Sequence, residues 1–247
     1  MAAKYRRHHV VILLSQPSTQ KNNLVSNPLI GILGGTFNPI HFGHLRMAQE
    51  LAESLQLNEV RFIPSANPPL KLAPLVSAKH RAAMVQLAIT GNPGFKFDDR
   101  ELYRVAADNL PSYTIDTLLS LRQELGGSAS LILFMGSDAF SKFNTWHAWE
   151  KIIQLCHIAL VQRPAASINV PLPKVLEIFL HNHYTENADD LREASAGYVT
   201  MQAITPLDIS STAIRNRLQN THSARYLMPD SVLDYIQSNR LYSAGTG

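Results

Sequence analysis

Two histidines three residues apart, His41 and His44, have the side-chain type and spacing to act on a bound anion. They follow a turn that contains Gly34 and Gly35 and come just before an apolar-periodic helix predicted to begin at about Leu45. Glycine lets a backbone approach a bound group closely, and a helix N-terminus offers unpaired N–H groups and partial positive charge. Imidazoles beside a phosphate would tend to be protonated and could donate hydrogen bonds to it. The stretch therefore indicates a phosphate site.

A plain structural interpretation of this stretch stays open as well. A strand, a glycine turn and a helix form a common unit, and any helix N-terminus is a generic anion site. The stretch lacks the Gly-Lys-Ser/Thr of a Walker loop and the Gly-x-Gly-x-x-Gly spacing of dinucleotide-binding turns. Residue types alone therefore do not decide between the two interpretations.

A second candidate site lies near the other end of the chain, at Ser210–Thr212 and Arg215. Three hydroxyl residues ahead of an apolar-periodic segment predict a capped helix N-terminus. Arg215 lies one helical turn beyond Thr212, and a guanidinium there can bind phosphate through two hydrogen bonds. Capping alone would also explain the hydroxyls.

The elements that must position these residues alternate between apolar strand-like runs and helical segments. This alternation predicts an α/β fold, a doubly wound, Rossmann-like parallel sheet with helices on both faces. The predicted strands span residues 29–33, 59–64, 95–99, 130–135, 156–161 and 199–204. Helices are predicted over residues 45–55 and 77–90, from 111, from 209 and over 229–239, with a helical connection at 165–198.

Further polar residues follow predicted strands, at the edge where open α/β sheets bind ligands. Lys71 lies in a proline-rich loop and would bring a cation to the side of the histidines, although a solvated lysine is the ordinary case. Asp138 could cap the next helix, or meet a ribose or a metal ion. Ser112 and Thr114 begin a helix, for which capping is a sufficient role. Trp146 could pack in an aromatic cluster or offer a flat face to a ring.

Composition limits the class of protein. The chain has 247 residues, 45% of them hydrophobic, and a formal net charge of +3. This mild basic excess suits an anionic substrate and falls short of the dense patch of a nucleic-acid binder. The single cysteine, Cys156, cannot form an internal disulfide and is expected to pack as a small hydrophobe, which fits a cytoplasmic protein. No apolar run approaches the ~20 residues of a membrane helix.

The domain organisation is predicted to be simple. Residues 1–28 are expected to form a flexible N-terminal extension, because their apolar core of about five residues is too short for a signal peptide. An edge strand at 9–14 is the structured alternative. Residues 29–247 are expected to form a single domain with a small C-terminal helical part at about 206–242.

Two motifs together resemble a known family. His41–His44 after Gly34–Phe37 resembles the His-x-Gly-His signature of the nucleotidyltransferase superfamily, and Ile209–Arg215 resembles its second motif, Ile-Ser-x-Thr-x-x-Arg. The longer string is similar to bacterial nicotinate-nucleotide adenylyltransferases. The resemblance extends over residues 29 to about 242 and includes a Pro-Pro-x-Lys loop, Ser-Tyr-Thr, Gly-x-Asp and a tryptophan segment.

The resemblance implies transfer of AMP from ATP to nicotinate mononucleotide, giving nicotinate adenine dinucleotide and pyrophosphate in NAD biosynthesis. Mg²⁺ would bridge substrate phosphates without a protein metal site. The implied catalytic residues are His41, His44 and Arg215. ATP and its phosphates would be bound by Gly34, Gly35, Thr36, Lys71, Ser211, Thr212 and Asp138. The nicotinate nucleotide would be bound by Ser112, Tyr113, Thr114 and Trp146. The histidines and Arg215 must then converge across one cleft.

The sequence departs from the family pattern at two positions. Asn38 stands where Asp is usual, and Leu70 stands where His often precedes the basic residue. Alternative functions are adenylyl or cytidylyl transfer to another phosphate such as the amide mononucleotide, a non-catalytic nucleotide-binding protein, and a basic nucleic-acid binder. No nucleic-acid or membrane partner is expected, and the choice between monomer and homo-oligomer stays open.

Overall fold

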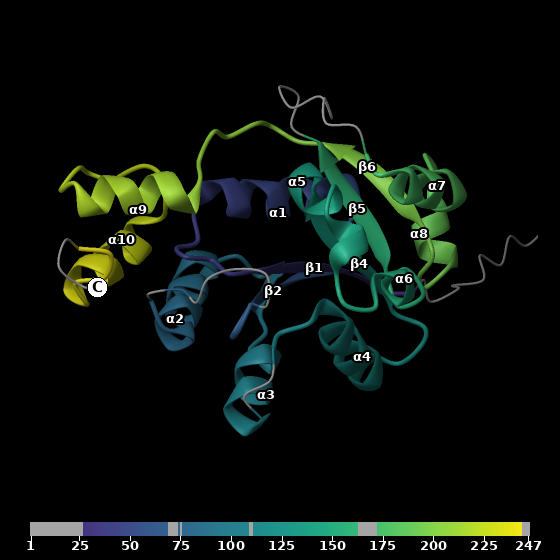
Figure 1. The fold of residues 1–247 in the computed structure, drawn as a ribbon, viewed down its shortest axis with the longest axis horizontal. Helices are drawn as coiled ribbons and strands as arrows, with labels where there is room; N and C mark the ends of the chain where they lie inside the picture. Colours follow the sequence, from purple (N-terminus) through teal and green to yellow (C-terminus); the bar gives the residue numbers. More distant parts are fainter. Residues whose placement is uncertain (1–26, 69–73, 75, 109–110, 163–171, 244–247) are drawn as a thin grey trace, which may run out of the picture.

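The computed structural model describes residues 27–68, 74, 76–108, 111–162 and 172–243 (Figure 1). Most of the predicted N-terminal extension, residues 1–26, lies outside this part. Leu70 and Lys71 lie outside it too.

Six parallel strands form one sheet in the order β3-β2-β1-β4-β5-β6. They are β1 (Leu29–Gly35), β2 (Glu59–Pro64), β3 (Phe95–Phe97), β4 (Ser130–Gly136), β5 (His157–Gln162) and β6 (Val199–Ala203). The chain moves from β1 outward to β3 at one edge, then returns to place β4, β5 and β6 toward the other. This doubly wound topology confirms the predicted fold class. Its switch point lies between β1 and β4, where open α/β sheets bind ligands.

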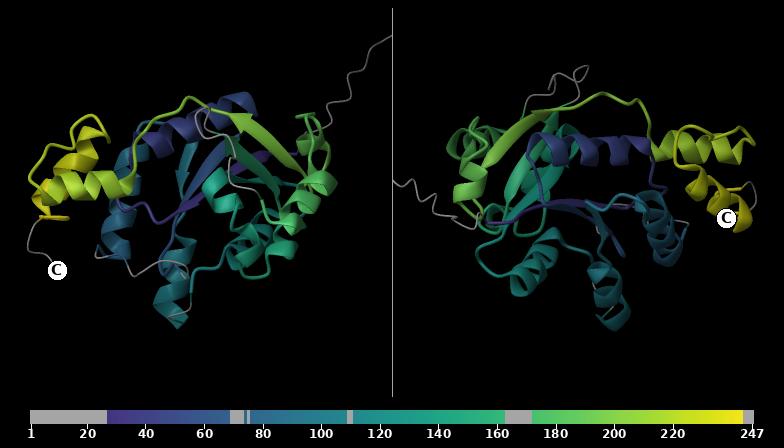
Figure 2. Two further views of the ribbon diagram at one scale, coloured as in Figure 1. Left: turned by 45° about the horizontal axis from the view of Figure 1, so that its top comes forward. Right: turned by 180° about the vertical axis from the view of Figure 1, so that it is seen from behind.

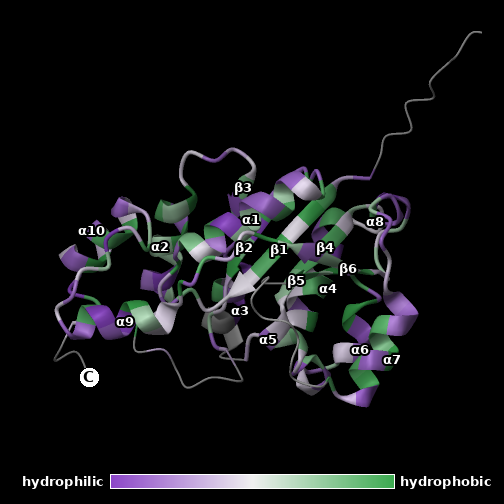
Figure 3. Ribbon diagram, turned by 90° about the horizontal axis from the view of Figure 1, so that it is seen from above, coloured by the Kyte–Doolittle hydropathy of each residue, from purple (hydrophilic) through white to green (hydrophobic). Residues whose placement is uncertain are grey.

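The central strands are apolar because helices cover both faces of the sheet. Successive side chains of β1 point to opposite faces, so Leu29 and Leu33 join one hydrophobic cluster and Ile30 and Ile32 join the other. Gly31 lies on the first face, where a Cβ would come 2.5 Å from the ring of Phe134. Figure 3 shows the strands as largely hydrophobic and the outer helices as mixed.

The helices divide between the two faces. Residues of α1, α2, α9 and α10 pack in the cluster with Leu29, and residues of α4, α6 and α7 pack in the cluster with Ile30. The helical elements are α1 (Phe42–Ser54), α2 (Ala78–Ile89), α3 (Arg100–Asp108), α4 (Thr114–Leu125), α5 (Ser137–Phe140), η1 (Phe143–Thr145), α6 (Trp149–Ile152), α7 (Lys174–His183), α8 (Asp190–Glu193), α9 (Ser211–Gln219) and α10 (Asp230–Ser238). In Figure 2, α9 and α10 lie at the opposite end of the molecule from α7 and α8. Among the described residues, none of the helices combines the length and apolar character of a membrane span.

Several boundaries differ from the sequence prediction, and one helix was not predicted. Helix α1 begins at Phe42 instead of Leu45, because the amides of His44 and Leu45 already bond to the carbonyl of His41. Strand β3 ends at Phe97. Helix α3 has no counterpart among the predicted elements, since its short sequence is rich in charge.

Cys156 packs as a small hydrophobe, as predicted. It is fully buried just before β5, and its thiol donates to the carbonyl of Ile152. Burial raises the pKa of this thiol to about 12, so it is unreactive at neutral pH.

Candidate functional site

The two histidines lie at the start of α1, directly after the turn that ends β1. His41 has extended backbone angles and is the N-cap residue, while His44 lies in the first helical turn. Their ring centroids are 3.8 Å apart, and His41 is only 4% exposed. A Cβ on Gly43 would come 3.0 Å from the His41 ring, so glycine at this position makes room for the imidazole. The rings of Phe37 and His44 also pack together nearly perpendicular to each other, with centroids 5.2 Å apart.

A cavity of about 240 Å³ opens beside this pair. It collects residues from α1, from the end of β4 and from the segment after β6, so it lies at the switch point of the sheet. Four of the predicted site residues line it: His41, His44, Asp138 and Ser211. The fold therefore places predicted site residues as far apart in the sequence as His41 and Ser211 in one cavity.

Helix α9 contacts the turn that precedes His41. Ser210 caps the helix by accepting from the amide of Ala213 at 3.1 Å, as its sequence predicts. Ser211 instead donates its hydroxyl to the carbonyl of Pro39 at 2.8 Å. Arg215 donates to the carbonyl of Asn38 at 2.8 Å and to the hydroxyl of Thr212 at 3.2 Å. The guanidinium thus lies on the same side of the sheet as the histidines, although neither it nor Thr212 lines the cavity.

Asn38 has a partner that suits its neutral side chain. The hydroxyl of Tyr242, near the end of the described chain, donates to the amide oxygen of Asn38 at 2.6 Å. Tyr242 is 5% exposed, and burial raises its pKa above the ordinary value although Arg215 and Arg81 oppose the shift. The amide therefore accepts from a neutral phenol without placing another charge in this turn.

The predicted nicotinate-binding residues form a second group. The amide of Ser112 donates to the carbonyl of Asn67 at 2.9 Å, and its hydroxyl accepts from the amide of Asn67 at 3.1 Å. The ring of Tyr113 lies 4.5 Å from that of His147, so the segments 112–114 and 146–147 meet. The rings of Trp146 and Phe143 pack nearly perpendicular to each other, with centroids 5.6 Å apart. None of these residues lines the cavity beside the histidines.

The capping alternatives for Ser112, Thr114 and Asp138 do not hold. Tyr113 is the N-cap of α4 and no side chain caps that helix, because Ser112 pairs with Asn67 and Thr114 is already the first helical residue. Asp138 lies inside α5, whose N-cap is Gly136, and its exposed side chain lines the cavity.

Sequence reasoning misses two buried charged residues near these segments, Arg81 and Glu101. Glu101 is 5% exposed and accepts from the hydroxyl of Thr117 at 2.7 Å. Burial raises its pKa, which its hydrogen bond to Thr117 and the charge of Arg104 oppose. Arg81 donates to the backbone carbonyls of Thr36 and Ala66. No sequence signal distinguishes either residue from a solvated charge on a helix.

The raised pKa of Glu101 predicts a pH-dependent gain from Glu101→Gln. An unfolded glutamate loses its proton near pH 4.3, so wild-type stability falls as pH rises from there to the folded-state pKa. Glutamine does not titrate, so its advantage grows over that window by about 1.4 kcal/mol for each unit of pKa elevation. Melting temperatures measured between about pH 4 and pH 7 check this. Glu124→Gln should show the opposite trend and at lower pH, because Arg100 and Arg61 outweigh burial and lower the pKa of Glu124. Its deficit relative to wild type should shrink as pH falls below about 4.3, so its melting temperatures are compared below that pH. The same sign of trend with pH in both variants would contradict the assignment.

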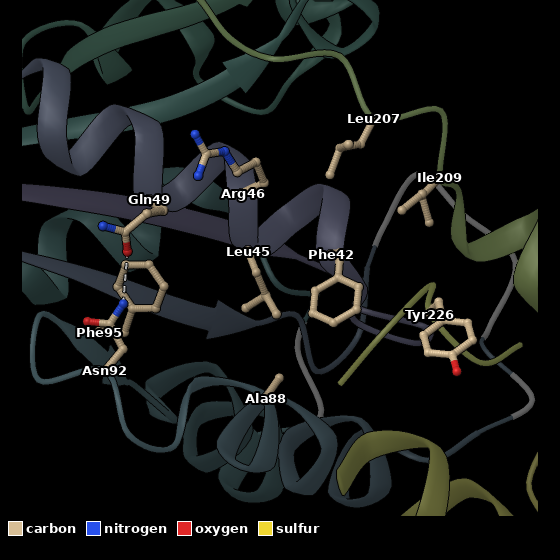
Figure 4. Close-up of a pocket in the computed structure, with 10 residues that line it drawn as sticks. All are labelled: Phe42, Leu45, Arg46, Gln49, Ala88, Asn92, Phe95, Leu207, Ile209 and Tyr226. Carbon is tan, nitrogen blue, oxygen red and sulfur yellow. Dashed lines mark hydrogen bonds between the residues drawn. The ribbon is translucent and has the colours of Figure 1, made fainter. Parts of the chain in front are cut away.

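A larger cavity of about 530 Å³ lies on the outer face of α1, and its lining is mainly apolar (Figure 4). Phe42 and Tyr226 point into it, and Gln49 and Asn92 face each other across a 2.9 Å hydrogen bond. None of the predicted site residues lines it. The smaller cavity is therefore the better candidate for the site, since it holds the groups that can bind phosphate.

Comparison with known proteins gives a consistent result. A family model described as cytidylyltransferase-like matches residues 32–217. A "probable nicotinate-nucleotide adenylyltransferase" of Pseudomonas entomophila is 45% identical over 217 residues, 87% of this chain and 95% of the relative. A protein of the same name from Hydrogenovibrio crunogenus is 46% identical over 220 residues, 88% of this chain and 99% of the relative.

Solved structures share the fold at low sequence identity. Nicotinic acid mononucleotide adenylyltransferase of Plasmodium falciparum, complexed with NaAD, superposes with a TM-score of 0.64 and 18% identity, covering 87% of this chain and 98% of the other. A putative nicotinate-nucleotide adenylyltransferase of Vibrio parahaemolyticus gives 0.55 and 19%, covering 88% and 99%.

Proposed function

Because the chain belongs to the nicotinate-nucleotide adenylyltransferases, within the cytidylyltransferase-like family, we propose that it transfers the adenylyl group of ATP to nicotinate mononucleotide. The products are nicotinate adenine dinucleotide and pyrophosphate, and the step belongs to NAD biosynthesis. One structural observation supports the proposal most. His41 and His44 share a cavity with Asp138 and Ser211. Arg215 donates to the carbonyl of Asn38, in the turn that leads to His41.

The reaction requires no protein nucleophile. The 5′-phosphate of the mononucleotide attacks the α-phosphorus of ATP in line, the new P–O bond forms, and the bond to the β-phosphate oxygen breaks to release pyrophosphate. Catalysis then depends on positioning the two substrates and stabilising charge on the transferred phosphoryl group.

The residues divide this work by position. His41 and His44 would donate hydrogen bonds to the α-phosphate, where negative charge develops. Ser211, Thr212, Arg215 and Lys71 would hold the β- and γ-phosphates, and Gly34, Gly35 and Thr36 would let the backbone approach ATP. The N-terminus of α1 adds its partial positive charge beside the histidines.

The second substrate would bind where segments 112–114 and 146–147 meet. Amide groups at the N-terminus of α4 suit the nicotinate carboxylate, and the indole of Trp146 suits a flat, positively charged pyridinium. Asp138 would accept from a ribose hydroxyl, because its exposed carboxylate lines the cavity between α1 and β4.

Mg²⁺ is the proposed metal ion. Phosphate oxygens and water are its preferred ligands, and a bound ion would neutralise charge on the triphosphate. Within the residues that the structure describes, no group of three His, Cys, Asp or Glu side chains could hold a metal ion. Asp138 supplies one carboxylate at the cavity, which fits an ion carried mainly by the substrate. Removing divalent metal with EDTA should abolish turnover, and Mg²⁺ should restore it.

Pyrophosphate release tests the proposed function directly. With ATP and Mg²⁺, release should require a mononucleotide, and the acid should react at least about tenfold faster than the amide because the site hydrogen-bonds a carboxylate. Replacing ATP with CTP should abolish release. Preference for the amide or for CTP would assign the chain to a sister activity, and no release with any pair would favour a non-catalytic nucleotide-binding protein.

A further inference from the structure

Arg81 is a fully buried arginine whose hydrogen bonds within the described residues go to backbone carbonyls. It lies in the first half of α2, is 1% exposed, and ranks among the largest fully buried side chains. Within the described ranges no ion pair involves it, and burial lowers its pKa although Tyr242 and Glu101 oppose the shift. Burying a guanidinium is costly unless every donor finds an acceptor, so its position needs a reason.

The acceptors come from three places. Arg81 donates to the carbonyl of Thr36 at 2.6 Å, to that of Ala66 at 3.2 Å and to that of Val76 at 3.4 Å. Thr36 belongs to the turn after β1, and Ala66 to the loop after the adjacent strand β2. Arg81 therefore links the segments that leave two neighbouring strands, beyond the backbone hydrogen bond that the Ser65 amide donates to the carbonyl of Gly35 at 2.8 Å.

These two segments lead to the two proposed substrate sites. The turn after β1 continues to His41 and His44. The loop after β2 continues from Ala66 to Asn67, which makes two backbone-centred hydrogen bonds with Ser112. Ser112 begins the segment 112–114 proposed for the nicotinate nucleotide. Arg81 thus connects the phosphate turn to the loop that meets the pyridine segment.

We propose that Arg81 is a positioning residue that couples the ATP site to the nicotinate-nucleotide site by fixing Thr36 and Ala66 relative to each other. The proposal rests on the proposed function. Binding of ATP orders the turn at Thr36, and this order is transmitted through Arg81 and Ala66 to Asn67 and Ser112. Arginine is suited to this role because its planar fork donates in several fixed directions, whereas lysine carries a single ammonium.

A purely structural role is the alternative, and the chain contains a matched control for it. Arg122 in α4 also bonds to backbone carbonyls: to Leu155 at 2.6 Å, Ala129 at 2.6 Å and Ser195 at 2.8 Å. These carbonyls precede β4, β5 and β6, so they lie at the N-terminal ends of the strands, whereas the cavity lies at the C-terminal ends. Arg122→Lys therefore removes the same kind of contact in the last turn of α4, at the other end of that helix from the segment 112–114.

The first experiment compares Arg81→Lys with Arg122→Lys in the full chain. Both should lower the melting temperature. Only Arg81→Lys should raise the KM for both ATP and nicotinate mononucleotide, each about tenfold to a hundredfold at a temperature where the variant is folded. A folded Arg81→Lys with both KM values within about twofold of wild type would overturn the proposal, as would an equal kinetic loss in Arg122→Lys.

A second experiment uses the wild-type chain, so it decides the question even if Arg81→Lys does not fold. A non-hydrolysable ATP analogue alone should slow hydrogen exchange of the Ser112 amide about tenfold, as well as that of His44 and Leu45. Protection of His44 and Leu45 without protection of Ser112 would overturn the coupling alone. No protection at any of the three would instead overturn the ATP site of the proposed function, and the coupling with it.

Discussion

His44→Ala should lower kcat by about 10²–10³-fold while the protein stays folded, because it removes a hydrogen-bond donor from the α-phosphate at the point of greatest charge. The side chain is half-buried, and the ring contacts it loses with Phe37 and His41 contribute only about 1 kcal/mol each to stability. The KM values should change much less than kcat, because the interaction strengthens in the transition state. Steady-state pyrophosphate release at saturating substrates measures this.

Two further variants distinguish the role of His44 from a general effect. His44→Gln keeps an N–H donor and should recover part of the lost rate if the imidazole acts as a hydrogen-bond donor. His181→Ala removes an exposed histidine of α7 and should leave kcat unchanged. Near-normal turnover in His44→Ala would remove this residue from the mechanism.

The sheet could be predicted from sequence because its strands carry a simple signal. β4 and β5 are buried on both faces, so they read as continuous apolar runs, and their predicted positions agree with the structure to within a residue or so. Helix α3 could not be predicted in the same way. Its nine residues are amphipathic but too few to stand out as a helix. Asp98 accepts from the amide of Arg100 at its start, and contacts such as that between Glu101 and Thr117 stabilise it.

The candidate site divides along similar lines. The glycines, histidines and hydroxyls are recognisable because they stand close together in short motifs at helix starts, where Gly43 leaves space for the ring of His41. Arg81 and Tyr242 could not be recognised, because their roles depend on partners that only the fold brings near them. Arg81 donates to the carbonyls of Thr36 and Ala66. Tyr242 donates to the amide oxygen of Asn38. Ser112 was recognisable as a polar residue at a helix start, but its bond to Asn67 follows only from the position of β2.

Arg215→Ala should act mainly through ATP. It removes the guanidinium proposed to bind the β- and γ-phosphates together with its bond to the carbonyl of Asn38. We expect the KM for ATP to rise about 10- to 100-fold, since charge-assisted hydrogen bonds to phosphate contribute about 1.5–3 kcal/mol. The KM for nicotinate mononucleotide should stay within about threefold of wild type, because that substrate binds beside the segment 112–114.

The same helix supplies the control. Arg217 is exposed on α9, and its side chain bonds to the carbonyl of Ser223, away from the phosphate turn. Arg217→Ala removes an equal charge from the same element, so it should leave both KM values unchanged if position and not net charge matters.

The contrast with Arg81 is informative as well: Arg215→Ala should raise the KM for one substrate, and Arg81→Lys should raise the KM for both. Unchanged ATP binding and turnover in Arg215→Ala would separate the second motif from the reaction, and the cavity between α1 and β4 would then have to bind the triphosphate without it.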